Sequence, residues 1–187
     1  MNRYEAVPTV YRGQHFPSRL EAQHATFLDS LNLKWVYEPS RLLLPDGTEY
    51  FPDFYLPEIT TWYEVRGRNE FSKPMALWKA VSPTGQTVVI GRPKGVLEVP
   101  YESETTTFSL DGAAISCSSC KRFWFANLND PAAGECPHCG DLTGGTESLS
   151  PNRAAAEAGL KVCWSSCFDW YQQQKHLSPS NQNIINF

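Results

Sequence analysis

The sequence predicts an α/β domain with a mixed sheet, followed by a small zinc ribbon. Helical and strand patterns alternate in the order α-β-β-β-α-β between about Pro17 and Arg92, an order typical of α/β domains. Further along, four cysteines occur as two Cys-x-x-Cys pairs, which is the pattern of a zinc ribbon. We therefore expect a core domain over residues 1–105, a ribbon over 106–148, and a C-terminal helical segment with a tail over 149–187.

The first helix is predicted from the signal at its start. Ser18 is a candidate N-cap, and Glu21 follows three residues later, which is the spacing of a capping box. Leucine and phenylalanine then recur at helical spacing as far as Leu31. We expect a helix from about Arg19 to Leu31.

Strand patterns and a second helix complete the predicted core. Pro45–Thr48 has turn chemistry, and β-branched and aromatic residues favour strands on both sides of it. Ser72 is a candidate cap for the second helix, with Pro74 in its first turn. The expected elements are a short strand over 34–39, a hairpin over 41–56, a strand over 60–67, a helix over 72–81 and a strand over 85–91.

Charge and cysteine content limit the class of protein. The formal net charge of -4 argues against a generally basic nucleic-acid binder, although it allows local basic patches. We see no signal peptide and no segment of transmembrane length, so we expect no membrane partner. Six cysteines without a secretion signal indicate a reducing compartment, and we expect a cytoplasmic protein.

Two acids and an arginine occur within Tyr50–Gly67, a segment that otherwise has the pattern of buried strands. Burying a carboxylate is costly unless it has a partner or a metal. Strand alternation places Glu64 and Arg66 on one face, and a turn through residues 57–60 allows Asp53 to lie beside them. Oxygen ligands on adjacent strands are what Mg²⁺ prefers, so this pattern predicts a divalent cation site.

The same residues carry a resemblance to a known family. The letters P-D at residues 52–53, followed by E-V-R at 64–66, resemble the signature of the PD-(D/E)XK nuclease superfamily. The resemblance covers about the first hundred residues and implies a restriction-endonuclease-like core. It also implies hydrolysis of DNA phosphodiester bonds with Mg²⁺ or Mn²⁺. Such a nuclease with an added zinc ribbon suits a bacterial, phage or mobile-element protein.

The resemblance assigns roles to individual residues. It implies that Glu21, Asp53, Glu64 and Arg66 are catalytic. The carboxylates of Glu21, Asp53 and Glu64, with the carbonyl of Val65, would then hold the metal. Arg66 would stabilise the scissile phosphate.

Arg66 departs from the family pattern, in which a lysine usually stands at this position. Arginine keeps the charge and grips phosphate in a bidentate manner, but it cannot release a proton. In some relatives the lysine lies on the following helix, where Lys73 and Lys79 are the candidates. The departure leaves a second function open, in which a catalytically weakened fold acts as a binding module for a protein or nucleic-acid partner.

Structural roles are the alternatives for the acids. Glu21 could act only as the capping partner of Ser18. Asp53 could simply end a strand. Glu64 and Arg66 could form a solvated pair on an edge strand.

The cysteine pattern predicts a structural Zn²⁺ site. Fifteen residues separate the Cys117/Cys120 pair from the Cys136/Cys139 pair, and two such knuckles complete a tetrahedral thiolate site. His138 lies inside the second knuckle, and we do not expect it to be a ligand. Cys163 and Cys167 lack a second pair, so we expect buried free thiols there.

Basic residues in two turns are candidate contacts to DNA phosphates. Arg92 and Lys94 belong to the turn after the last core strand, although a solvated turn is the alternative. Lys121 and Arg122 precede the aromatic run at 123–125. These aromatic side chains suit either the small core of a ribbon or stacking on bases, and we favour the core. We expect His15 and His24 to be surface or core-edge residues rather than ligands.

Overall fold

The computed structural model describes residues 6–67, 70–102, 109–142 and 148–149. It is a mixed α/β structure with one large sheet and two helices, which confirms the predicted class. The predicted C-terminal helical segment, with Cys163 and Cys167, lies outside the described residues. None of the helices in the described ranges is long and apolar enough to cross a membrane.

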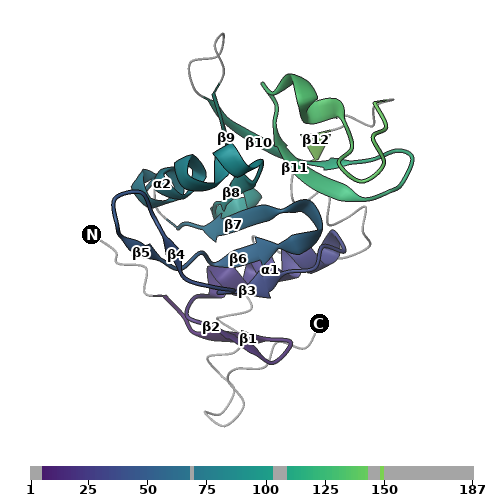
Figure 1. Cartoon of the computed structure of the whole chain (residues 1–187). Helices are drawn as coiled ribbons and strands as arrows, with labels where there is room; N and C mark the ends of the chain where they lie inside the picture. The colour runs from purple at the N-terminus through teal and green to yellow at the C-terminus, as the bar shows by residue number, and fades with distance from the viewer. Residues whose placement is uncertain (1–5, 68–69, 103–108, 143–147, 150–187) are drawn as a thin grey trace.

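One mixed sheet forms the centre of the molecule (Figure 1). Its order is β11-β10-β9-β8-β7-β6-β3, and β12 also pairs with β10. β7 and β8 are parallel, and the other pairs are antiparallel. The strands are β3 (Val36–Tyr37), β6 (Phe54–Leu56), β7 (Thr61–Val65), β8 (Thr87–Gly91), β9 (Leu97–Tyr101), β10 (Ser109–Ser116), β11 (Phe123–Asn127) and β12 (Ser148–Leu149).

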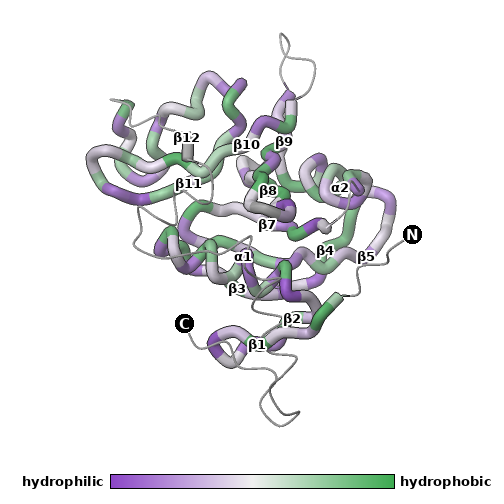
Figure 2. Tube along the Cα trace, turned by 180° about the vertical axis from the view of Figure 1, so that it is seen from behind, coloured by the Kyte–Doolittle hydropathy of each residue, from purple (hydrophilic) through white to green (hydrophobic). Residues whose placement is uncertain are grey.

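The two helices cover opposite faces of this sheet. Helix α1 (Arg19–Ser30) packs into a core that includes Tyr63 of β7, whereas α2 (Ser72–Val81) packs into a core that includes Trp62. Neighbouring residues of a strand point to opposite faces, so the helices form outer layers on each side. The strand β8 is hydrophobic in Figure 2, whereas α1 alternates along its length. This matches a strand covered on both faces and a helix covered on one.

The predicted start of α1 is confirmed. The Ser18 hydroxyl accepts the backbone N–H of Glu21 at 3.2 Å, as an N-cap does. The helix ends at Ser30, one residue before the predicted limit. The predicted cap of α2 was wrong, because Phe71 is the N-cap residue and Ser72 is already helical.

The predicted hairpin over residues 41–56 is divided into two parts. β4 (Leu42–Leu43) pairs with β5 (Glu49–Tyr50) in a small separate sheet, and β6 joins the main sheet only at Phe54. Pro52 lies in the gap and has no N–H to donate to a ladder. The interruption leaves Asp53 just before β6, beside the strand that carries Glu64. Another small sheet pairs β1 (Thr9–Tyr11) with β2 (Gln14–Phe16).

The sheet continues from the core into the cysteine-containing part. β9, which contains Pro100, was not predicted. It pairs with β8 on one side and with β10 on the other. β10 then pairs with β11. In the sequence, β11 lies between the two cysteine pairs. The predicted boundary between residues 105 and 106 stays a prediction.

Gly91 allows α1 to approach the sheet closely. His24 of α1 is fully buried. Its Nδ1 accepts a hydrogen bond from the Tyr63 hydroxyl at 2.7 Å, and its Nε2 donates one to the Arg92 carbonyl at 3.2 Å. Burial lowers the pKa of His24 to about 3, so the ring is neutral. A Cβ at Gly91 would lie 2.6 Å from the His24 ring and 2.8 Å from the Tyr63 ring.

We expect Gly91→Ala to lower the free energy of unfolding by about 1–3 kcal/mol, because both rings are fixed by hydrogen bonds and cannot yield to the methyl group. Chemical denaturation at neutral pH measures this change. Gly67→Ala is the matched control, since its Cβ would meet only the Leu20 side chain at an ordinary 3.8 Å. Equal stabilities of the two variants would contradict this account of the packing.

Candidate functional site

Asp53, Glu64 and Arg66 meet where β7 ends. β6 and β7 pair with Phe54 opposite Tyr63, which places Asp53 next to the end of β7. Asp53 Oδ2 accepts the backbone N–H of Val65 at 2.7 Å. The Arg66 guanidinium contacts both acids, with Nη1 at 3.2 Å from Asp53 Oδ2 and Nη2 at 2.5 Å from Glu64 Oε2. The structure therefore brings together three of the four predicted catalytic residues.

Glu64 is the most deeply buried member of this group. Its side chain is 0% exposed, against 16% for Asp53 and 21% for Arg66. Glu64 Oε2 accepts the Tyr50 hydroxyl at 2.5 Å, and Tyr50 in turn accepts an N–H from Arg66. Glu64 Oε1 is buried and has no hydrogen-bond partner among the described residues. An unpaired carboxylate oxygen in the interior is costly, so this atom is suited to a ligand.

The electrostatics of the group show an excess of negative charge. Burial, with the nearby Glu64 charge, raises the pKa of Asp53 to about 8, although Arg66 opposes the shift. Burial also raises the pKa of Glu64, against the opposing effects of Arg66, Tyr50 and the backbone N–H of Asp53. Burial would lower the pKa of Arg66, but Glu64 and Asp53 outweigh it and raise that pKa. One guanidinium thus faces two acids, and a further cation would stabilise both carboxylates.

Glu21 lies near the group but has partners of its own. Its Oε1 accepts the Ser18 hydroxyl at 2.6 Å, and its Oε2 accepts the Tyr37 hydroxyl at 2.7 Å. Its charge contributes to raising the pKa values of Asp53 and Glu64. The capping interaction with Ser18 is therefore present, and the metal-ligand role of Glu21 stays a prediction.

The alternative of a solvated edge pair was wrong for Glu64 and Arg66. β7 is an inner strand, paired with β6 on one side and β8 on the other, and Glu64 is buried. The Val65 carbonyl, a predicted metal ligand, accepts Arg66 Nη1 at 3.0 Å. Lys73 and Lys79 are exposed on α2, and neither forms an ion pair with another described residue.

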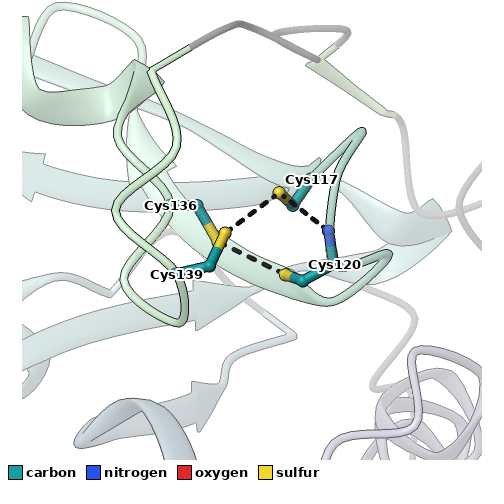
Figure 3. A group of neighbouring side chains, drawn as sticks. All are labelled: Cys117, Cys120, Cys136 and Cys139. Carbon is teal, nitrogen blue, oxygen red and sulfur yellow. Dashed lines mark hydrogen bonds between the residues drawn. The ribbon is translucent and has the colours of Figure 1, made fainter.

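The four cysteines form a second cluster, shown in Figure 3. Their sulfur atoms all lie within 4.8 Å of one another, and they form the only group of three or more potential metal-ligating side chains at that spacing in the described ranges. Cys117 Sγ is 3.7 Å from Cys139 Sγ, and Cys120 Sγ is 3.6 Å from Cys136 Sγ. A tetrahedron with Zn–S bonds of about 2.3 Å has edges of about 3.8 Å, so the cluster fits a metal such as zinc.

Equivalent backbone turns hold the two cysteine pairs. The N–H of Lys121 donates to the Cys117 carbonyl at 3.0 Å, and the N–H of Gly140 donates to the Cys136 carbonyl at 2.8 Å. Lys121 and Gly140 both have positive φ, 61° and 69°. His138 lies outside the cluster, with Nε2 hydrogen-bonded to the Phe123 carbonyl at 3.2 Å, in agreement with the prediction that it is not a ligand.

The aromatic run after the first cysteine pair is buried, although only its middle residue lies in the small core beside the cysteines that was predicted. Phe123 and Phe125 are buried in the same cluster as Phe27 and Tyr63, whereas Trp124 is buried beside the cysteines. Successive residues of β11 therefore pack into two different cores. Lys121 and Arg122 remain exposed next to this strand, and their contact with DNA stays a prediction.

Arg92 does not belong to a solvated turn. Its guanidinium is buried, with Nε 2.7 Å from Glu98 Oε2 and its carbon 4.4 Å from the centre of the Phe71 ring. This arrangement does not favour the predicted phosphate contact by Arg92, which stays a prediction. The side chain of Lys94 lies outside the described part. His15 is exposed and His24 is buried, so His15 lies at the surface as expected, whereas His24 belongs to the core interior.

Sequence reasoning missed the two tyrosines that hold the acids. Tyr50 and Tyr37 have the spacing of ordinary core aromatics, and the sequence does not show where their hydroxyls point. Alternation along the chain places Tyr50 opposite its neighbour Phe51, which is exposed, but it does not show that the Tyr50 hydroxyl binds Glu64.

No protein-family model matches this chain, and no match was found among curated proteins. Its function is therefore argued from the fold and from these two clusters.

We expect about one zinc ion per purified chain, bound by the four cysteines. Cys136→Ser should release the metal and lower the melting temperature by about 5 °C or more, because metal binding contributes folding free energy. Elemental analysis and calorimetry check both results. Cys163→Ser serves as the control and should retain the metal. Wild-type protein without zinc, purified without chelator, would rule out this site.

Proposed function

We propose that this chain is a metal-dependent nuclease that hydrolyses phosphodiester bonds of DNA. One observation carries the proposal. Buried Glu64, with its unpartnered Oε1, lies beside Asp53 at the end of an inner strand, and one arginine contacts both acids. Two carboxylates that share one arginine are suited to bind a divalent cation. The adjacent guanidinium is suited to bind a phosphate.

The order of elements supports the proposal. The order α1, β3, β6, β7, α2 and β8 agrees with the α-β-β-β-α-β core implied by the resemblance to PD-(D/E)XK nucleases. The β4–β5 hairpin is inserted between the first two of these strands. In this arrangement Asp53 directly precedes β6 and Glu64 lies on the adjacent strand β7, where the two acids of the signature would be expected.

The residues present fit a divalent ion such as Mg²⁺ or Mn²⁺. Asp53 and Glu64 would offer the carboxylate oxygens that Arg66 does not contact, and Glu21 contributes negative charge from α1. The Val65 carbonyl, which accepts Arg66 Nη1 in this structure, would add an oxygen ligand once Arg66 releases it. Hard oxygen donors are what these ions prefer. When bound, the ion lowers the pKa of a water molecule and offsets charge on the phosphate.

The protein groups orient this chemistry. The Val65 N–H fixes Asp53 through Oδ2, while Tyr50 and Arg66 fix Glu64 through Oε2. Arg66 is partly exposed and binds the scissile phosphate as it passes the end of β7. Because arginine does not release its proton, Arg66 stabilises charge and another group or solvent accepts the proton of the attacking water.

The zinc ribbon completes the proposed enzyme. It extends the sheet through β10 and β11, and Lys121 and Arg122 are exposed on it. These two side chains, with Lys94, are the proposed contacts to the DNA backbone. A cytoplasmic location and a bacterial, phage or mobile-element origin remain predictions.

A binding module is the second candidate function. Arg66 already contacts Asp53, Glu64, Tyr50 and the Val65 carbonyl. Its charge and hydrogen bonds therefore stabilise the two acids without a metal ion. A network of this kind can stabilise a fold that no longer cleaves. The net negative charge of the chain suits a protein partner better than DNA.

We expect the purified protein to nick supercoiled plasmid DNA when Mg²⁺ or Mn²⁺ is added. Asp53→Asn and Glu64→Gln should each reduce the rate roughly 100-fold or more, because each removes a charged ligand. Arg66→Lys should retain cleavage, since it keeps the cation. Glu49→Gln, which changes an exposed pair with Arg41, is the matched control. A wild-type protein that never cleaves, with zinc bound, would favour the binding module.

We expect Asp53→Asn to leave the melting temperature of the metal-free protein unchanged or higher. The amide oxygen still accepts the Val65 N–H, and the variant removes a carboxyl whose ionisation is opposed by burial and by the charge of Glu64. If Asp53 served only as an ion-pair partner of Arg66, its loss would cost about 3–5 kcal/mol. The same variant should lose the stabilisation that Mn²⁺ gives the wild type. Scanning calorimetry with and without Mn²⁺ measures both effects.

A further inference from the structure

We infer that a cleft between α2 and the cysteine-bearing segment (residues 117–142) binds an arginine-containing segment of a partner protein. The cleft has a volume of about 500 Å³, which lies within the range of about 300–1,000 Å³ that is typical of ligand sites. Figure 1 shows α2 and the cysteine-bearing segment on either side of β8. The inference goes beyond the proposed nuclease and does not depend on it.

The cleft lies at the end of the sheet where the parallel strands β7 and β8 begin. Trp78, near the end of α2, lines one wall, and Trp124 of β11 lines another, together with the short helix η4 (Pro131–Gly134). Thr61, the first residue of β7, also lines the cleft. The acids beside Arg66 lie at the opposite end of this strand, and a strand of this length spans about 13 Å. The cleft is therefore separate from the candidate metal site.

The lining of this cleft carries negative charge. Glu102, Asp130 and Glu135 line it, and no described lysine, arginine or histidine does. None of the three acids forms an ion pair with another described residue. Because negative charge repels phosphate and attracts cations, the cleft suits a cationic ligand rather than a nucleic acid.

Aromatic side chains line the cleft together with the acids. Trp78 and Tyr101 are partly exposed, and Trp124 is buried. A guanidinium is planar, stacks on aromatic rings and pairs with carboxylates through several N–H groups. It is also more weakly hydrated than an ammonium group, so it loses less on leaving water. Acids and aromatic rings in one cleft therefore favour arginine over lysine.

Hydrogen bonds within the protein hold the acidic wall in place. Asn127 Nδ2 donates to the Val99 carbonyl of β9 at 2.5 Å. Asp130 Oδ1 accepts the Ala132 N–H at 2.9 Å and so caps η4. Its Oδ2 has no hydrogen bond with another described residue and is left for a ligand. A site that is formed before binding loses less entropy when the ligand arrives.

The size and the mixed lining of the cleft favour a protein segment over a small amine. A free amine would fill a small part of the volume and leave the remaining surface in water. Thr60 and Ser82 add hydroxyl groups to the lining, which can bond to peptide groups. Ile59 and Pro137 add apolar surface, which suits the residues that flank an arginine. We therefore commit to a partner protein.

The test titrates the full-length protein with the peptide acetyl-Gly-Arg-Gly-Arg-Gly-amide and follows tryptophan fluorescence, because Trp78 and Trp124 line the cleft. We expect saturable binding that weakens about tenfold or more when citrulline replaces both arginines, since citrulline has a similar shape but no charge. The double variant Glu102→Gln, Glu135→Gln should also bind the arginine peptide about tenfold more weakly.

The double variant Glu49→Gln, Glu70→Gln is the matched control. It removes the same charge at two exposed positions outside the cleft, so its affinity should equal that of the wild type. Zinc content and melting temperature are measured in every variant to show that the fold is intact. If the cleft variant loses zinc, Glu102→Lys replaces it, because residue 102 lies outside the cysteine-bearing segment, and this change should abolish binding.

Several results would overturn the inference. Wild-type protein that does not bind the peptide at millimolar concentration would exclude the site. Equal losses in the two double variants would show that binding depends on the general charge of the chain. Putrescine, a diamine with the same charge as the peptide, should bind much more weakly, and equal affinity would mean that the cleft takes small amines. Competition by a short DNA duplex would assign the cleft to nucleic acid instead.

Discussion

Glu64 imposes the strongest constraint on this structure, because its carboxylate is buried in an inner strand of the sheet. A charge in that position is tolerated only if hydrogen bonds and opposite charge surround it. Arg66 and Tyr50 provide both, and each comes from a neighbouring part of the chain. Asp53 lies beside the same arginine, because β6 begins at Phe54 and pairs with β7 opposite Tyr63.

The second organising feature is the way in which the cysteine cluster joins the core. β11 begins three residues after Cys120 and directs Phe125 toward Phe27 and Tyr63. Rings at these separations contribute to packing beyond their buried area. The geometry of the cysteine turns is therefore linked to the packing of α1 on the sheet.

Much of the fold follows from local patterns in the sequence. The capping box at Ser18, the apolar strand at 87–91 and the cysteine spacing each specify one feature through short-range chemistry, and the structure has all three. The division at Pro52 and the strand containing Pro100 were missed. Pairing of β9 with β8 and β10 decides the outcome at Pro100, whereas Pro52 interrupts the predicted hairpin because it has no N–H to donate to a ladder.

The candidate site was predictable only in part. Strand alternation is enough to place Glu64 and Arg66 together, and the resemblance adds Asp53. The burial of Arg92 and the role of Tyr50 depend on side chains that meet across the fold, Arg92 with Glu98 and Tyr50 with Glu64. No spacing rule in the sequence encodes these contacts. The hydroxyl of a tyrosine is polar, but its position in a sequence does not indicate what it will bind.

The alternation of β11 also bears on how such a protein can be rearranged by recombination or by design. Phe123 and Phe125 cover the face that α1 packs on, while Trp124 covers the cysteine turns. The segment with the four cysteines, transferred alone to another scaffold, would carry one unmatched apolar face, and the donor would lose part of the covering of Tyr63. The cysteine-bearing segment therefore shares its apolar contacts with the host sheet, so moving it to another protein would require a scaffold that matches both faces of β11.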